Sequence, residues 1–224
     1  MSTTSFWVIG DTPYSSAART ALAEYLRNVP PEVKFIIHVG DIWPGTQRSP
    51  ALSGYQSVAD LLRQSPVPVF IIPGDNETTD TIDPTLAFQN WTITFNHFDE
   101  NWTHHIGVSH QVGREENFAF VLDETLYVGI NLVGGGNDSQ VLADDLAWIQ
   151  SKFAECKDQV TCTVIFAQAS PSSGNSTFQA GLIAAAQDFA EPILYVMGDK
   201  HAWQLDQPYD EAPNFTRVVI EATG

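Results

Sequence analysis

The stretch VFIIPGDNE, residues 69–77, decides how the fold of this chain is interpreted, because an apolar run stops abruptly on Gly-Asp. The same design occurs three more times, as FWVIGD at 6–11, FIIHVGD at 35–41 and ILYVMGD at 193–199. Short runs of β-branched and aromatic residues without polar alternation are typical of strands that are buried on both faces. The four stretches therefore predict four central strands of a mostly parallel sheet.

An aspartate follows each of these predicted strands: Asp11, Asp41, Asp75 and Asp199. The preceding glycine is expected to let the backbone turn without a Cβ clash. A single Gly-Asp is more often a turn or a helix cap, but the carboxyl ends of parallel strands lie along one edge, where ligand crevices form. Carboxylates gathered in a crevice repel one another unless a cation lies between them. The repeated motif therefore predicts a site for a divalent cation.

Length and charge limit the classes of partner. The 224 residues fit one domain, 1–224, and no apolar run approaches the roughly 20 residues of a membrane-spanning helix. No signal peptide is recognisable at the N-terminus. The formal net charge of −17 disfavours nucleic acid and anionic membranes as partners. Phosphate chemistry in so acidic a protein would need bound metal, although the acidity is also compatible with solubility or salt adaptation.

Two features bear on localisation. Cys156 and Cys162 have a spacing that is compatible with a disulfide across a short loop or with two reduced thiols. Patterns of the type Asn-x-Ser/Thr begin at Asn76, Asn90, Asn101, Asn137, Asn175 and Asn214. Together they favour a secreted or extracellular protein, although a glycan on Asn76 would obstruct the expected site.

The segments between the strands show helical spacing and turn signals. Apolar spacing predicts a helix that begins at Ser15 or Ser16, a helix around 58–62, and helices over 141–153 and 179–189. Further strands are expected at 118–122 and 126–130, which form a hairpin, and at 161–166 and 217–222. The order is β-α-β-α-β followed by a second sheet.

Three other segments have two interpretations or a loose pattern. Residues 77–117 are expected to be an insertion, a cap or a long loop, whose clustered histidines are hydrogen-bonded or solvated rather than zinc ligands. The loop 42–50 is rich in Pro and Gly and is expected to carry binding residues. The glycines at 134–136 either surround an anion with backbone N–H groups or form a flexible connection.

The order of these motifs resembles the calcineurin-like metallophosphoesterases. That family has Asp-x-His, Gly-Asp, Gly-Asn-His-Asp/Glu, a lone His and Gly-His-x-His, each at a strand end. The corresponding positions here are 11–13, 40–41, 74–77, Gln168 and 198–201, so the resemblance spans nearly the whole chain. It implies an α/β fold, a four-layer α-β-β-α sandwich of two mixed sheets flanked by helices.

The chain departs from the family at four histidines. Pro13, Asn76, Gln168 and Asp199 stand where the family has His, and His201 remains. Asn cannot act as a general acid, so protonation of the leaving group is expected from Glu77 or His201. The replacements Asn76, Gln168 and Asp199 all present oxygen, which suits Mg²⁺, Mn²⁺ or Ca²⁺ better than Zn²⁺ or Fe.

The resemblance implies a phosphatase or phosphodiesterase that uses metal-activated water on a small phosphorylated substrate. One or two ions are expected, bound by Asp11, Asp41, Asp75, Gln168, Asp199 and His201, with Asp41 between them. Asn76, Glu77 and His201 are the catalytic candidates, and Tyr14, Asn131 and Lys200 are candidates for substrate contact. Lys200 is alternatively a replacement for one ion. The competing interpretation is a catalytically impaired relative that serves as a metal-binding or interaction module.

Overall fold

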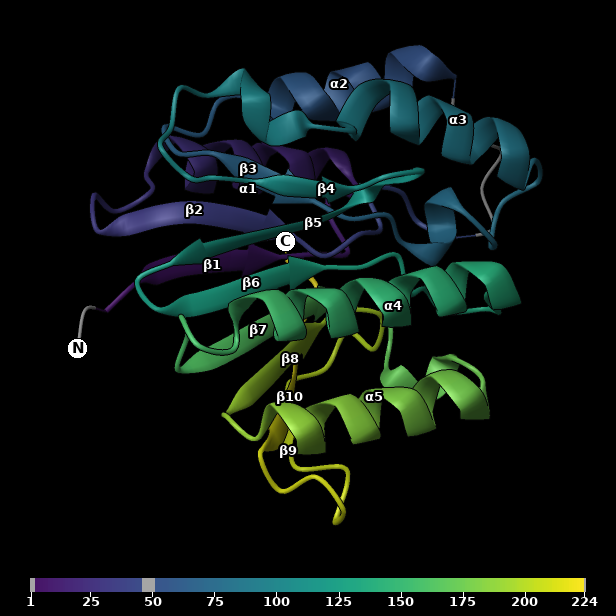
Figure 1. Ribbon diagram of the computed structural model, residues 1–224. Coiled ribbons are helices and arrows are strands. Elements are labelled where there is room, and N and C mark those ends of the chain that lie inside the picture. The colour runs from purple at the N-terminus through teal and green to yellow at the C-terminus, as the bar shows by residue number, and fades with distance from the viewer. Residues whose placement is uncertain (1–2, 46–50, 224) are drawn as a thin grey trace.

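The computed structural model describes residues 3–45 and 51–223, which form four layers in the order helix, sheet, sheet, helix (Figure 1). The smaller sheet is entirely parallel and has the strand order β1-β2-β3. Its strands are β1 (Ser5–Ile9), β2 (Val33–His38) and β3 (Val69–Ile71). Three of the four Gly-Asp motifs follow these strands, so their carboxyl ends bring Asp11, Asp41 and Asp75 to one edge.

The larger sheet is mixed and has seven strands in the order β4-β5-β6-β7-β8-β10-β9. They are β4 (Ser109–Gln111), β5 (Arg114–Leu122), β6 (Thr125–Gly129), β7 (Cys162–Ala167), β8 (Ile193–Met197), β9 (Gln204–Asp206) and β10 (Phe215–Val219). Strands β6, β7, β8 and β10 are parallel to one another, whereas β4, β5 and β9 run antiparallel to their neighbours. The fourth Gly-Asp motif follows β8, so Asp199 comes from this second sheet.

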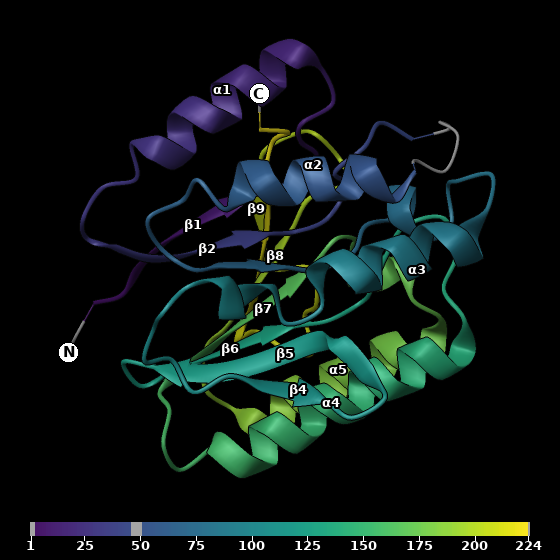
Figure 2. The ribbon, with the colours of Figure 1, turned by 90° about the horizontal axis from the view of Figure 1, so that it is seen from above.

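Helices cover the outer face of each sheet (Figures 1 and 2). The helices α1 (Ser16–Arg27), α2 (Leu52–Leu62) and α3 (Pro84–Phe95) pack on the smaller sheet, and α4 (Ser139–Cys156) and α5 (Ser176–Phe189) pack on the larger one. Short 3₁₀ helices occur at Asp75–Glu77, Phe98–Asn101 and Pro171–Ser173. The predicted start of α1 is confirmed, because the Ser15 hydroxyl accepts a hydrogen bond from the Ala18 N–H and caps the helix.

An aromatic core holds the two sheets together. Phe35 and Phe70 of the smaller sheet meet Phe120 of the larger one, with ring centroids 5.2 and 4.7 Å from it. All three rings are buried, and the opposite faces of the same strands pack on helices. This burial on both faces is the physical reason that the strands appear as uninterrupted apolar runs.

The segment 77–117 is part of the sandwich rather than a separate cap. Trp91 and Phe95 of α3 are buried in the core under the helices, and β4 pairs with β5 at the edge of the larger sheet. Its histidines are hydrogen-bonded or exposed, as expected: His97 contacts Glu100 and Glu115 at 3.2 and 3.1 Å, whereas His105 is exposed.

Cys156 and Cys162 are both free thiols, so the disulfide alternative is not realised in this structure. In the described part of the chain, no helix has the length and apolar character needed to cross a membrane. Residues 46–50 of the predicted binding loop lie outside the described residues.

Candidate active site

The four aspartates after the strands converge on one place at the junction of the two sheets. The amide nitrogen of Gln168, just after β7, lies 3.3 Å from Asp41 Oδ2, 3.2 Å from Asp75 Oδ1 and 3.4 Å from Asp199 Oδ1. Asp11 joins this group through a hydroxyl that it shares with Asp41. The structure therefore brings all four predicted carboxylates together.

That shared hydroxyl belongs to Tyr14, which lies 3.4 Å from both Asp11 Oδ1 and Asp41 Oδ2. His201 is on the same side, with Nε2 3.0 Å from Asp11 Oδ1, and its side chain is 51% exposed. The other carboxylate oxygen of Asp11, Oδ2, is buried and has no hydrogen-bond partner. This side of the site therefore has a carboxylate oxygen without a hydrogen-bond partner, although the backbone N–H of Asp199 is near enough to the Asp11 carboxyl to lower its pKa.

The backbone holds these groups in an uncommon conformation. Asp11, Asp41, Asp199 and His201 have φ angles of 54°, 61°, 70° and 51°, in the left-handed region. Residues other than glycine are found there only when the surrounding structure enforces it, and such positions cluster at functional sites. Such conformations also occur away from the site, at His97, Asp123, Glu124 and Ala190, but four of them fall on residues that line it.

Electrostatic repulsion is concentrated at Asp41. Burial raises the pKa of its carboxyl well above the usual range, and the nearby charges of Glu77, Asp75 and Asp11 raise it further. Burial also raises the pKa of Asp11 and of Asp75. Several carboxylates therefore lie close together with too little positive charge near them. A divalent cation would reduce their mutual repulsion.

The two sides of the site differ in how well their side chains suit a cation. On the side where Tyr14 contacts Asp11 and Asp41, the negative charge and the unpartnered Asp11 Oδ2 suit a hard cation. On the Gln168 side, Oε1 accepts a hydrogen bond of 2.8 Å from the Gly134 N–H, so the amide NH₂ group, rather than the expected oxygen, faces the carboxylates. Among the described residues, no group of three or more His, Cys, Asp and Glu side chains is arranged to hold a metal ion.

Glu77 does not lie where a side chain that donates a proton to the substrate is expected to lie. Its side chain is fully buried and accepts hydrogen bonds from the backbone N–H groups of Asp41, Ile42 and Gly74, at 3.0, 2.8 and 2.9 Å. Burial raises the pKa of Glu77 to about 7. This carboxyl group ties the loops after β2 and β3 together, which favours a structural role over proton transfer to substrate.

Asn76 also positions other groups. Its backbone N–H donates to Asp41 Oδ1 at 3.1 Å, and its side-chain amide donates to the Trp43 carbonyl at 2.6 Å. The same amide nitrogen lies 3.4 Å from the Tyr14 hydroxyl. Asn76 therefore fixes one side of the site, whereas Lys200 is exposed, and its charge is one of the influences that lower the pKa of Asp206.

A cavity of about 560 Å³ is lined by the predicted residue Asn131, and none of the four aspartates of the carboxylate group lines it. Thr79 also lines it and donates a hydrogen bond of 3.2 Å to the carbonyl of Gly134, which packs against Asp75. Arg114 brings a positive charge to the same wall. Sequence reasoning missed Thr79 and Arg114. Arg114 is the first residue of β5 and lies four residues before the expected strand 118–122, and a basic residue there, in a chain with only 10 Lys and Arg, was the available signal.

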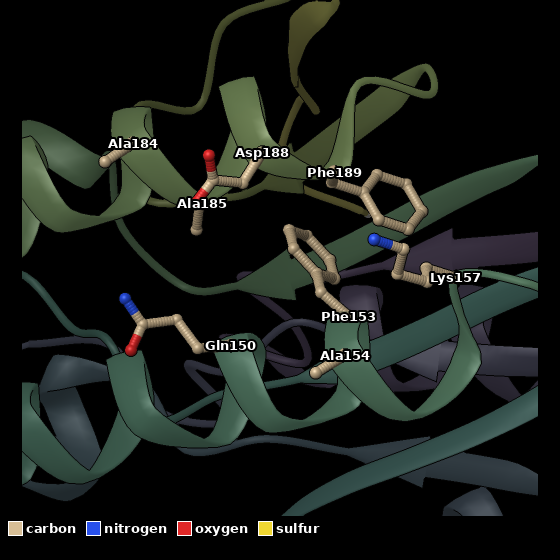
Figure 3. Close-up of a pocket in the computed structure, with 8 residues that line it drawn as sticks. All are labelled: Gln150, Phe153, Ala154, Lys157, Ala184, Ala185, Asp188 and Phe189. Carbon is tan, nitrogen blue, oxygen red and sulfur yellow. The ribbon is translucent and has the colours of Figure 1, made fainter.

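A second cavity, of about 300 Å³, lies between α4 and α5, away from the carboxylates (Figure 3). The stacked rings of Phe153 and Phe189 form part of its wall, and their centroids are 4.4 Å apart. Its titratable lining residues are Lys157 and Asp188. This composition offers no counterpart to the carboxylate cluster, so the candidate site is the one at the strand ends.

Comparisons with known proteins agree with this fold. The model of the family described as calcineurin-like phosphoesterase matches residues 4–203. GAP50, described as the anchor in the inner membrane complex of Plasmodium, superposes with a TM-score of 0.60 at 12% identity, over 96% of this chain and 70% of that one. The protein TT1561 of Thermus thermophilus superposes with a TM-score of 0.56 at 12% identity, over 99% of this chain and 91% of that one.

At such low identity the two structures bear on the fold alone, and a search of curated proteins finds no match. The family model spans most of the chain, and members of the family usually bind divalent metal ions. The chain belongs to the calcineurin-like phosphoesterase family.

Proposed function

We propose that this protein is a metal-dependent phosphoester hydrolase that acts on a small phosphorylated substrate. The observation that carries the proposal is the convergence of four strand-end carboxylates around a site where Asp11 Oδ2 is buried without a partner. Family membership supports it, because the family suggests metal-dependent phosphoester hydrolysis. A divalent cation held by these carboxylates would activate water and neutralise charge on the phosphate.

The choice of cation follows from the ligands. Asp11, Asp41, Asp75 and Asp199 offer carboxylate oxygens, and His201 is the imidazole among the predicted ligands. Oxygen-rich sites suit Mg²⁺, Mn²⁺ or Ca²⁺ better than Zn²⁺ or Fe. We therefore propose a hard cation as the cofactor.

His201 is the side chain that we assign to proton transfer. It is half exposed, and its Nε2 contacts Asp11, so it lies where a substrate would enter. Imidazole can donate a proton to the oxygen of a leaving group, which the amide of Asn76 cannot do. The buried position of Glu77 makes it the less suitable donor.

The cavity lined by Asn131 and Thr79 is our candidate for the organic part of the substrate, because Thr79 bonds the carbonyl of Gly134, which packs against Asp75. Its volume of about 560 Å³ is in the range of small-molecule pockets. Asn131, Thr79 and Arg114 supply polar contacts there, while Tyr14 would contact the phosphate end at the carboxylates.

The direct test is hydrolysis of an aryl phosphate and of a bis-aryl phosphate by chelator-treated protein after addition of Mg²⁺, Mn²⁺, Ca²⁺ or Zn²⁺. We expect turnover with a hard cation, reduced at least about 100-fold in Asp41→Asn, because Asp41 lies between both parts of the site. Asp158→Asn, at an exposed position just after α4, is the matched control and should keep full activity. Equal rates for the wild type and Asp41→Asn with every ion would contradict the proposal.

A specific observation favours a second candidate, a non-catalytic metal-binding or interaction module. Gln168 turns its NH₂ group toward the carboxylates, and three further family histidines are replaced. The likeness to GAP50, which is described as an anchor, is compatible with such a role. Cation binding without turnover on either substrate would support this candidate over the hydrolase.

A further inference from the structure

We infer that Gln168 takes the place of one cation, so that the site binds a single divalent ion on the side formed by Asp11, Asp41 and Tyr14. The inference rests on the proposed metal dependence and goes beyond it, because it fixes the number of ions and their place. It depends on the orientation of one amide group and on the difference between the two sides of the site.

The orientation of the Gln168 amide is set by a backbone group. Gln168 is fully buried, and its Oε1 accepts a 2.8 Å hydrogen bond from the Gly134 N–H. The NH₂ group consequently lies within 3.4 Å of one oxygen from each of three carboxylates, those of Asp41, Asp75 and Asp199. An amide NH₂ group has donors only and cannot ligate a cation. Its partial positive charge serves the carboxylates instead.

Reversal of this amide is opposed by its surroundings. A flipped Gln168 would point NH₂ at the Gly134 N–H and would place its oxygen among three carboxylates, so both ends would face groups of their own kind. Gly134 has little room to adjust, since a Cβ on it would lie 2.5 Å from Asp75 Oδ2 and 3.2 Å from Asp199 Oδ1. The close packing therefore keeps the donor on this side of the site.

The side of the site formed by Tyr14, Asp11 and Asp41 differs from the Gln168 side in its hydrogen bonds and in its exposure. The Tyr14 hydroxyl is only in long contact, 3.4 Å, with Asp11 and Asp41, and its side chain is partly exposed. A hydroxyl oxygen keeps lone pairs that can face a cation, unlike an NH₂ group. Asp11 is 3% exposed, and its Oδ2 has no partner. An ion on this side would meet an oxygen of Asp11 that has no hydrogen bond to lose, whereas an ion beside Gln168 would displace its NH₂ group from three carboxylates.

The experiment counts ions. Metal-free protein is titrated with Mn²⁺ in a calorimeter, and the bound metal is measured by elemental analysis after equilibrium dialysis. We expect one Mn²⁺ per wild-type chain and two in Gln168→His, because imidazole supplies the lone pair that the amide lacks. Two ions about 3.5–4 Å apart would also give a spin-coupled Mn²⁺ resonance spectrum. Gln187→His, on the exposed surface of α5, is the matched control and should still bind one.

A second pair of variants locates the ion and does not depend on the folding of Gln168→His. Asp11→Asn should weaken Mn²⁺ binding about tenfold more than Asp199→Asn does, a difference typical of a ligand compared with a more distant group. Equal losses, or a larger loss in Asp199→Asn, would overturn the placement.

The possible counts separate the two proposals. Two ions on the wild type would overturn the inference and leave the proposed hydrolase intact. No ion on the wild type would overturn both. One ion on both the wild type and a folded Gln168→His would overturn the role of Gln168.

Discussion

Close packing around the carboxylates restricts which residues can stand beside them. A Cβ on Gly74 would lie 1.9 Å from Asp41 Oδ1, and a Cβ on Gly198 would lie 2.6 Å from Asp11 Oδ2. Both distances are far below van der Waals contact, so these positions accept only glycine. In these two motifs the glycine therefore makes room for a carboxylate from another strand, whereas a Cβ on Gly10 would meet Val39 and a Cβ on Gly40 would meet the backbone of Gly74.

Gly134 provides the first test at this scale. In Gly134→Ala the new methyl group would displace Asp75 or Asp199, and misplacement of about 1 Å at a reacting centre costs about 100-fold in rate. We expect a loss of that size in aryl phosphate hydrolysis, with little change in the thermal unfolding midpoint. Gly107→Ala is the control, because a Cβ added to Gly107 would have nothing within 4 Å. Unchanged rates in Gly134→Ala would contradict the packing argument.

Glu77 provides the second test. Glu77→Gln replaces one acceptor oxygen with an NH₂ group that faces backbone donors, and each buried donor left without an acceptor costs about 1–3 kcal/mol. We expect the free energy of unfolding, measured in urea, to fall by about 2–4 kcal/mol. Glu32→Gln, at an exposed position before β2, should change it by less than about 0.5 kcal/mol. A stable but inactive Glu77→Gln would point back to proton transfer.

The motifs predicted the convergence of the four aspartates but offered an incomplete reason for their glycines. Only Gly40 has a left-handed φ, 89°; at the other three motifs the turn does not fall on glycine. The orientation of Gln168 and the role of Glu77 were not predictable, because both depend on backbone N–H groups of segments distant in sequence, at Gly134 and at Asp41. The motifs predict which side chains reach the site, whereas contacts between distant segments determine which atom of each side chain faces its centre.

At the scale of elements, helix α4 carries a buried polar group on its inner face. Asp145 is 0% exposed, and its Oδ1 accepts a 2.7 Å hydrogen bond from the Asn117 amide of β5. Its Oδ2 has no hydrogen-bond partner. Burial raises the pKa of Asp145 to about 7, against the hydrogen bond from Asn117, which lowers it.

This raised pKa predicts a pH dependence of stability. The folded state holds the Asp145 proton more tightly than the unfolded state, so ionisation destabilises the fold progressively from about pH 4 to about pH 7. Each pKa unit corresponds to about 1.4 kcal/mol, so the contribution is at most about 4 kcal/mol. Asp145→Asn should therefore gain stability relative to the wild type as the pH rises from 5 to 8 in urea unfolding. Asp144→Asn is the control, and parallel curves for Asp145→Asn and the wild type would contradict the assignment.

Strands were predictable from the sequence where they are buried on both faces, and less so at the edges. The edge strand β9 has three residues and carries the exposed Leu205, so it shows no apolar run. The sequence pattern indicates only a short helix near 84–90, whereas α3 continues to Phe95, although Ala87, Trp91 and Phe95 recur at helical spacing and are buried. The polar residues between them obscure this stripe, and its burial against α2 is a tertiary contact.

For the whole molecule, the aromatic layer between the sheets links parts of the chain that are distant in sequence. Phe35 of β2 contacts Phe70 of the same sheet and Phe120 and Tyr127 of the larger sheet, with ring centroids 5.0–5.9 Å apart. The candidate site depends on the same contact, because Asp11, Asp41 and Asp75 follow one sheet while Gln168 and Asp199 follow the other. Loss of the interface between the sheets would therefore separate the carboxylates.

The last prediction concerns cooperativity. Since neither sheet buries its aromatic face without the other, we expect one unfolding transition for the chain, seen at the same urea concentration by far-ultraviolet circular dichroism and by tryptophan fluorescence. Phe35→Ala leaves a cavity between the sheets and should lower the free energy of unfolding by about 3–5 kcal/mol while keeping a single transition. Trp203→Ala, which removes a ring that is 63% exposed, is the control and should have little effect. Two separate transitions in the wild type would show that the sheets fold independently, and the site would then form only after they dock.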